Sequence, residues 1–144
     1  MYGNVCKLIM EVKCMAHILI VDDEINIRKV VREYAEFEGY EVTEAENGRI
    51  AVEKFTNSPE NSFDVILMDI MMPEMNGYEA TKAIRSSNHP DAKKIPIIAM
   101  TANAFAEDKI KAIESGMNAH TSKPINFPVL VSEITKILNR DEDF

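Results

Sequence analysis

An aspartate stands at the end of an uncharged apolar run in this sequence. The run 65–68 carries no charge until Asp69 interrupts it, and a segment rich in turn-forming residues follows at once, with Pro73, Asn76 and Gly77. A carboxylate in such a place is either held by structural hydrogen bonds or chemically reactive. The residue types at equivalent places in the chain decide between these two interpretations.

Other polar side chains also stand directly after apolar runs. They are two carboxylates, a hydroxyl and an ammonium: Asp22, Asp23, Thr101 and Lys123. The carboxyl ends of parallel strands share one edge of a sheet. If the apolar runs are parallel strands, these four groups are therefore expected to converge on Asp69.

Convergent carboxylates require a cation. Two carboxylates about 4 Å apart repel each other by roughly 4 kcal/mol at an effective dielectric constant near 20. A set of oxygen ligands with no His or Cys nearby suits Mg²⁺, which commonly takes one or two carboxylates together with waters and phosphate oxygens. The spacing of Asp22, Asp23 and Asp69 therefore predicts a magnesium site.

Each of these residues also has a purely structural interpretation. Asp23 could cap a helix that begins near Ile25, and Asp69 could accept backbone N–H groups from the following turn. Thr101 and Lys123 are ordinary residues for a strand end when each is considered alone. A shared functional site explains all of them at once, whereas the structural interpretations need a separate coincidence for each.

The combined set favours phosphoryl transfer onto Asp69. The sequence has no GxxxxGK[ST] loop, and no GxGxxG follows the first apolar run, so it lacks both of these nucleotide-binding motifs. A carboxylate beside Mg²⁺ and Lys123 can act as a nucleophile toward phosphorus, because both cations neutralise the charge that develops.

Short apolar runs alternate with amphipathic stretches along the chain. This alternation predicts five strand–helix units that form a parallel sheet covered on both faces, doubly wound in the strand order 2-1-3-4-5. On the helix around 106–115, Ile110 and Ile113 are expected to face inward. The predicted strands are 18–21, 40–45, 65–68, 95–100 and 119–122, and the predicted helices lie around 27–38, 51–55, 78–86, 106–115 and 127–138.

Composition excludes several classes of protein. The 144 residues include 24 acidic and 16 basic side chains, a formal charge of −8 without a basic cluster, which argues against direct nucleic-acid binding. No apolar run approaches the ~20 residues of a membrane span, and charged residues interrupt the first fifteen, so neither membrane insertion nor a signal peptide is expected. Cys6 and Cys14 do not make a disulfide framework. The sequence therefore predicts a cytoplasmic protein.

Four segments together carry a resemblance to a known family. HILIVDDE, VILMDIMMPEMNG, IIAMTANA and HTSKPI resemble, in this order, the signature segments of the receiver domain of two-component response regulators. The resemblance covers residues 16–139 and implies a flavodoxin-like (βα)5 fold. It also implies a signalling domain, not an enzyme in its own right, that promotes its own phosphorylation and dephosphorylation and changes its partner interactions.

The resemblance assigns a role to each residue of the predicted site. Asp69 is the implied phosphoacceptor, which takes a phosphoryl group from a phosphohistidine on a sensor histidine kinase or a histidine phosphotransfer protein. The implied ligands of Mg²⁺ are Asp22, Asp23, Asp69 and the backbone carbonyl of Met71. The implied contacts of the phosphoryl group are Thr101, Lys123 and the backbone N–H of Ala102.

The resemblance also draws attention to His120, to Pro124 and to the side chain of Met71. His120 occupies the switch position, where Tyr or Phe is usual, so it either turns inward when Thr101 moves, adds pH sensitivity, or is partly exposed without a special role. Pro124 follows the lysine at a place where receivers carry a cis proline. Met71 stands where other receivers have polar groups that influence dephosphorylation.

The two ends of the chain lie outside the resemblance. Residues 1–15 have apolar spacing compatible with a short amphipathic helix, which would dock on the domain, mediate pairing or reflect an upstream start codon, and residues 140–144 form an acidic tail. No output domain is expected after Asn139, and a homodimer on phosphorylation is compatible with the family. The alternatives are an inert pseudo-receiver and a Mg²⁺-dependent phosphatase of haloacid-dehalogenase type, which carries a second Asp where Met71 stands.

Overall fold

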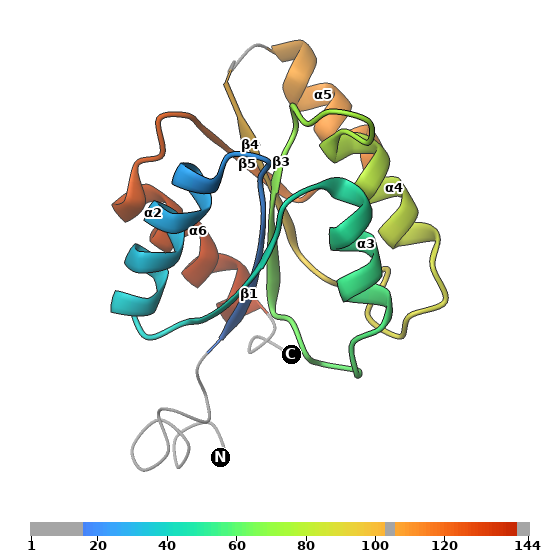
Figure 1. Ribbon diagram of the computed structural model, residues 1–144, viewed down its shortest axis with the longest axis horizontal. Coiled ribbons are helices and arrows are strands. Elements are labelled where there is room, and N and C mark those ends of the chain that lie inside the picture. The colour runs from blue at the N-terminus through green and yellow to red at the C-terminus, as the bar shows by residue number, and fades with distance from the viewer. Residues whose placement is uncertain (1–15, 103–105, 141–144) are drawn as a thin grey trace.

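A five-stranded parallel sheet forms the centre of the molecule (Figure 1). The computed structural model describes residues 16–102 and 106–140, so the predictions for residues 1–15 and for most of the acidic tail fall outside the described residues. The strands are β1 (His17–Val21), β2 (Glu41–Ala45), β3 (Val65–Asp69), β4 (Ile97–Thr101) and β5 (Ala119–Ser122). Their order in the sheet is β2-β1-β3-β4-β5 and every pair is parallel, which confirms the predicted doubly wound topology.

Helices cover both faces of this sheet (Figure 1). The helices are α2 (Ile25–Phe37), α3 (Gly48–Thr56), α4 (Gly77–Ser86), α5 (Ala106–Ser115) and α6 (Phe127–Arg140). Figure 1 shows α2 and α6 on one face and α3, α4 and α5 on the other. None of the helices in the described ranges has the length and apolarity that a membrane span requires.

Alternate residues of the central strands supply two separate cores. Ile18 and Ile20 of β1 pack with α2 and α6, whereas Leu19 and Val21 pack with α3 and α4. Successive side chains of a strand point to opposite faces, so a strand covered on both sides must be apolar throughout. This explains why β3 is buried along its whole length, and it makes the buried carboxylate of Asp69 exceptional among its neighbours.

Two strands begin later than the sequence pattern predicts. Tyr40 precedes β2, because its backbone N–H donates to Ala35 O at the end of α2. Ile95 and Pro96 precede β4. Pro96 has no N–H to donate, and its carbonyl oxygen accepts from Ile66 N at 2.9 Å.

The inward face of α5 was predicted wrongly. Ile110 and Ile113 are 56% and 71% exposed, whereas Ala112 and Ser115 are buried. Residues three apart share a helix face, and the face formed by the two small residues lies against the sheet. Spacing cannot separate these two faces, because both recur with the period of a helix.

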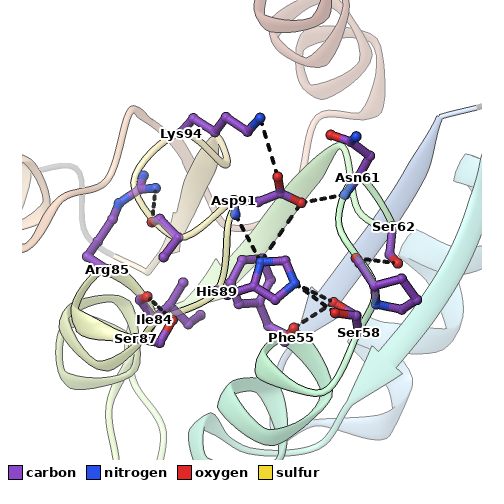
Figure 2. A network of polar contacts seen from close by, with 12 residues as sticks. Phe55, Ser58, Asn61, Ser62, Ile84, Arg85, Ser87, His89, Asp91 and Lys94 are labelled. Atoms are coloured by element: carbon purple, nitrogen blue, oxygen red, sulfur yellow. Dashed lines mark hydrogen bonds and ion pairs between the residues drawn. The ribbon is translucent and has the colours of Figure 1, made fainter.

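A buried polar network ties two loops together at the amino-terminal edge of the sheet (Figure 2). His89 Nε2 donates to Ser58 O at 2.8 Å, and His89 Nδ1 accepts from Asp91 N at 3.0 Å, so the ring is a neutral tautomer with both nitrogens satisfied. Asp91 Oδ2 accepts from Asn61 N at 2.6 Å. The loops that precede β3 and β4 are thus joined through His89 and Asp91, whose side chains are only 3% and 4% exposed.

We expect Asp91→Ala to destabilise the protein by about 1–3 kcal/mol, because the Asn61 N–H loses its charged acceptor. Urea denaturation measures this change. Lys94→Ala is the control, since Lys94 Nζ lies 3.5 Å from Asp91 Oδ1 on a side chain that is 64% exposed, and an exposed ion pair contributes about 0–1 kcal/mol. Equal stabilities of the two variants would contradict the role of Asp91.

Candidate functional site

The carboxyl ends of the strands meet at the upper edge of the sheet in Figure 1. Asp69 is the last residue of β3 and Thr101 the last residue of β4, while Asp22 directly follows β1 and Lys123 directly follows β5. Asp22 is fully buried, Asp69 is 2% exposed and Thr101 is 5% exposed. The topology therefore places these four polar residues, from four different strands, at one edge.

Lys123 joins two carboxylates of this edge. Its Nζ lies 2.9 Å from Asp22 Oδ2 and 3.2 Å from Asp69 Oδ1. The lysine side chain is 18% exposed, so its ammonium lies at the boundary between the protein and solvent. One cation thus bridges the ends of β1 and β3, which are neighbours in the sheet.

Burial makes the carboxyl group of Asp69 unusually basic. Removal from water and the nearby charge of Asp22 raise the pKa of Asp69 from 3.8 to about 7, although Lys123 acts in the opposite direction. Burial lowers the pKa of Lys123, but its hydrogen bond to Asp22 and the charge of Asp69 more than offset this, and the net pKa is raised. Lys123 therefore keeps its charge, while Asp69 exchanges its proton near neutral pH.

Backbone N–H groups hold both carboxylates in place. Asp22 Oδ1 accepts from Glu24 N at 2.9 Å, and Asp69 Oδ1 accepts a long bond from Met71 N at 3.3 Å. Asp69 thus accepts one backbone N–H from the following turn, as its structural interpretation expected. This bond alone does not account for a buried carboxylate that also contacts Lys123.

The acidic residues after β1 form a cluster of carboxylate oxygens. Carboxylate oxygens of Asp22, Asp23 and Glu24 all lie within 4.8 Å of one another; Asp22 is buried and the other two are exposed. Glu24, not Asp23, is the N-cap residue of α2, and the Glu24 side chain makes no capping hydrogen bond, so the structural interpretation of Asp23 as a cap is wrong. The oxygen-only donor set fits Mg²⁺. Glu24 was not among the predicted site residues, although it continues the acidic run of Asp22 and Asp23.

The loop after Asp69 folds back onto the end of β3. Gly77 N donates to Ile70 O at 2.9 Å, and a Cβ atom at Gly77 would collide with the carbonyl oxygen of Asp69. Asn76 and Glu79 then form a capping box that begins α4. Glycine is therefore required where the loop crosses the strand end, and this crossing fixes the backbone of Asp69.

The remaining predicted residues lie around this centre. Lys123 N donates to Thr101 O at 2.7 Å, which ties the end of β5 to the end of β4, and the peptide bond between Lys123 and Pro124 is cis, the geometry that the resemblance implied. Ala102 and Met71 are exposed beside the site. His120 is also exposed, and within the described residues no hydrogen bond or ion pair joins it to Asp69 or Lys123.

We expect the metal-free protein to lose stability as the pH rises from 5 to 8. The folded state holds the proton of Asp69 with a pKa of about 7, against 3.8 for an unperturbed Asp. This stabilisation is complete below about pH 4 and is lost as the pH rises through 7, which corresponds to about 3 kcal/mol between pH 5 and 8. Urea denaturation in EDTA measures the change.

Asp69→Asn is the matched control for this pH dependence. The amide has no proton to exchange, so the variant retains only the contribution of the other titrating groups. A pH profile identical to that of the wild type would show that Asp69 is not the group responsible.

The fold and this edge define a class of protein: a doubly wound parallel α/β domain with buried carboxylates and a bridging lysine at the carboxyl ends of its strands. Residues 18–135 match the model of the response regulator receiver domain family. The chain belongs to this family, whose members are the receiver domains of two-component signalling systems.

Individual relatives agree with this assignment. The response regulator SaeR of Staphylococcus aureus is 36% identical over 126 residues, which are 88% of this chain and 52% of SaeR, so the chain spans about half the length of this relative. Among solved structures, the chemotaxis protein CheY4 of Vibrio cholerae is 35% identical with a TM-score of 0.79, over 86% of this chain and 99% of CheY4.

One further solved structure bears on the acidic cluster. The receiver domain of the sensor histidine kinase PA1611 from Pseudomonas aeruginosa is 33% identical with a TM-score of 0.72, over 88% of this chain and 96% of that domain. Its structure contains a magnesium ion coordinated in the active-site cleft. Receiver domains of response regulators interact with histidine kinases.

Proposed function

We propose that Asp69 accepts a phosphoryl group from the phosphohistidine of a sensor histidine kinase or a histidine phosphotransfer protein. The observation that carries this proposal is the contact of Lys123 Nζ with the carboxylates of Asp22 and Asp69 at 2.9 and 3.2 Å. This contact joins a buried carboxylate to a positive charge, which supports the proposed role of Asp69 as a nucleophile. Ordinary surface carboxylates have neither feature.

A carboxylate oxygen of Asp69 would attack phosphorus as the bond between phosphorus and the histidine nitrogen breaks. The imidazole leaves with the electron pair and takes up a proton. Lys123, the hydroxyl of Thr101 and the backbone N–H of Ala102 would bind the oxygens of the transferred group. Since Lys123 already lies against Asp69, this ammonium needs little movement to follow the phosphoryl group.

Mg²⁺ is the proposed cofactor. Asp22, Asp23, Asp69 and the backbone carbonyl of Met71 would hold it, and the ion would supply neutralisation of charge on the phosphoryl oxygens. The carboxylate oxygens of Asp22, Asp23 and Glu24 lie within 4.8 Å of one another, and this negative charge supports a hard cation beside Asp22 and Asp23. His120 is exposed on β5, and we propose that its side chain turns inward when Thr101 moves.

The phosphatase alternative is not supported. An enzyme of haloacid-dehalogenase type needs a second acid two residues after its nucleophile, and Met71 stands there with 72% of its surface exposed. An inert pseudo-receiver is also disfavoured, because Asp22, Asp69 and Lys123 are all present and in contact.

The direct test is phosphorylation by a small donor. The protein is incubated with acetyl phosphate or phosphoramidate in Mg²⁺ or in EDTA, and its intact mass is measured before and after hydroxylamine, which cleaves acyl phosphates. The expected result is one phosphoryl group per chain, only with Mg²⁺ and removed by hydroxylamine. A protein that stays unmodified under conditions that phosphorylate a known receiver would refute the proposed function.

A further inference from the structure

Arg28 reaches from α2 to the backbone that carries the acidic cluster. Its Nη1 donates to the carbonyl oxygen of Asp22 at 2.8 Å, and its Nε donates to Glu44 Oε1 at 2.9 Å. The arginine side chain is 12% exposed. Neither the sequence pattern nor the family assignment singled out this residue.

These bonds fix the backbone of Asp22 from both sides. Asp22 N donates to Ala45 O at the end of β2, at 3.2 Å, and Asp22 O accepts from Arg28. The Asp22 side chain is bound as well, by Glu24 N and Lys123 Nζ. The peptide that links Asp22 to Asp23 is thus held by Arg28, and its orientation sets the direction in which Asp23 leaves the strand.

Glu44 balances the charge of this arginine. Its two carboxylate oxygens bind Arg28 Nε at 2.9 Å and Arg32 Nη1 at 2.7 Å. The hydrogen bond from Arg32 and that from Arg28 lower the pKa of Glu44, so it is ionised at neutral pH. The guanidinium of Arg28 is therefore partly neutralised where it approaches the acidic cluster.

We propose that Arg28 is a positioning residue for the cation site: by holding the carbonyl of Asp22, it keeps the carboxylates of Asp22 and Asp23 close enough together to bind one Mg²⁺. The proposal rests on the proposed function, since it concerns the same cluster. Carboxylates without a cation repel each other, and the tether from Arg28 opposes their separation before the metal arrives.

The sign of the effect separates positioning from charge. Arg28 is a cation near a cation site, so its charge alone weakens the binding of Mg²⁺, and its removal would strengthen binding. Loss of positioning has the opposite effect. Partners that orient metal ligands change metal affinity by about 10–100-fold, and we expect Arg28→Met to weaken Mg²⁺ binding by about 10-fold, the lower end of that range.

Arg32→Met is the matched control. Arg32 lies one turn further along α2 and binds the same Glu44, but within the described residues its hydrogen bonds go only to Glu44 and Glu36. Methionine retains the apolar stem of arginine in both variants. Isothermal titration with MgCl₂ gives the dissociation constant of each, and urea denaturation in EDTA measures metal-free stability separately.

The expected result is weaker Mg²⁺ binding by Arg28→Met and wild-type binding by Arg32→Met. Equal or tighter binding by Arg28→Met would overturn the proposal, as would a loss shared by both variants. If Arg28→Met does not fold, Arg28→Lys and Arg32→Lys replace the pair. The single ammonium of lysine cannot reproduce the two contacts of Arg28, with Asp22 O and with Glu44, so weaker Mg²⁺ binding is expected only for Arg28→Lys. Equal affinities of Arg28→Lys and Arg32→Lys for Mg²⁺ would overturn the proposal.

The wild-type titration separates this inference from the proposed function. Wild-type protein that binds no Mg²⁺ would refute the magnesium site and with it the role of Arg28. Wild-type protein that binds Mg²⁺ with the same affinity as Arg28→Met would refute only the positioning role, and the proposed phosphoacceptor site would stand.

Discussion

Asp69→Ala is expected to accept no phosphoryl group from acetyl phosphate or phosphoramidate, under conditions that fully modify the wild type. Alanine offers no nucleophilic oxygen, and the backbone around residue 69 is held by Gly77 independently of the side chain. The expected loss is therefore complete rather than partial. Intact mass and peptide mapping of the hydroxylamine-sensitive adduct measure it.

The same variant distinguishes loss of chemistry from loss of fold. Asp69→Ala removes a buried carboxylate whose pKa is raised to about 7, so at pH 8 the metal-free variant is expected to be at least as stable as the wild type. Asp64→Ala is a suitable control for the phosphorylation assay, because it removes an acidic residue at the opposite edge of the sheet from Asp69. There the Asp64 carboxylate accepts from His17 N at 2.8 Å. Modification that persists in Asp69→Ala would assign the phosphoacceptor to another residue.

The double variant Asp22→Asn/Asp23→Asn is expected to bind Mg²⁺ at least about 100-fold more weakly than the wild type. Even residues that only orient a ligand change metal affinity by about 10–100-fold, and this variant removes two charged ligands from a cluster 4.8 Å across. Phosphorylation by small donors should fall with the affinity and recover in part at high Mg²⁺ concentration. Isothermal titration measures the first effect, and the rate of adduct formation measures the second.

Glu24→Gln is the control for the double variant. Its carboxylate belongs to the same cluster but is not among the proposed ligands, and the Glu24 N–H that binds Asp22 remains. A small change in affinity is expected. If Glu24→Gln weakens binding as much as the double variant does, general negative charge rather than direct ligation by Asp22 and Asp23 holds the ion.

Local sequence patterns were sufficient to predict the architecture. The run at β3 is apolar on both faces because the strand is covered on both faces, and runs of this kind require a parallel sheet with helical crossovers. Right-handed crossovers then leave few strand orders, and the order β2-β1-β3-β4-β5 is among them. Predicting the fold needed no long-range contact, since strand type and connection length are local properties.

The sequence also identified the residues that gather at the carboxyl edge. A parallel sheet brings all strand ends of one polarity together, so Asp22, Asp69 and Lys123 had to lie at one edge once their runs were assigned as strands. Their contacts confirm this convergence, while their roles in phosphoryl transfer are proposals.

The buried face of α5, the pKa of Asp69 and the contact of Arg28 depend on tertiary packing. The prediction for Ile110 and Ile113 was wrong because α5 has two faces with helical spacing, and the face with Ala112 is the one that is buried. The elevated pKa of Asp69 depends on its burial beside Asp22, a residue 47 places away in the chain. Arg28 reaches Asp22 O only because α2 folds back over the end of β1. Residue types and spacing thus determined which elements form and where their ends meet, whereas distances, burial and hydrogen-bond partners exist only after those elements pack.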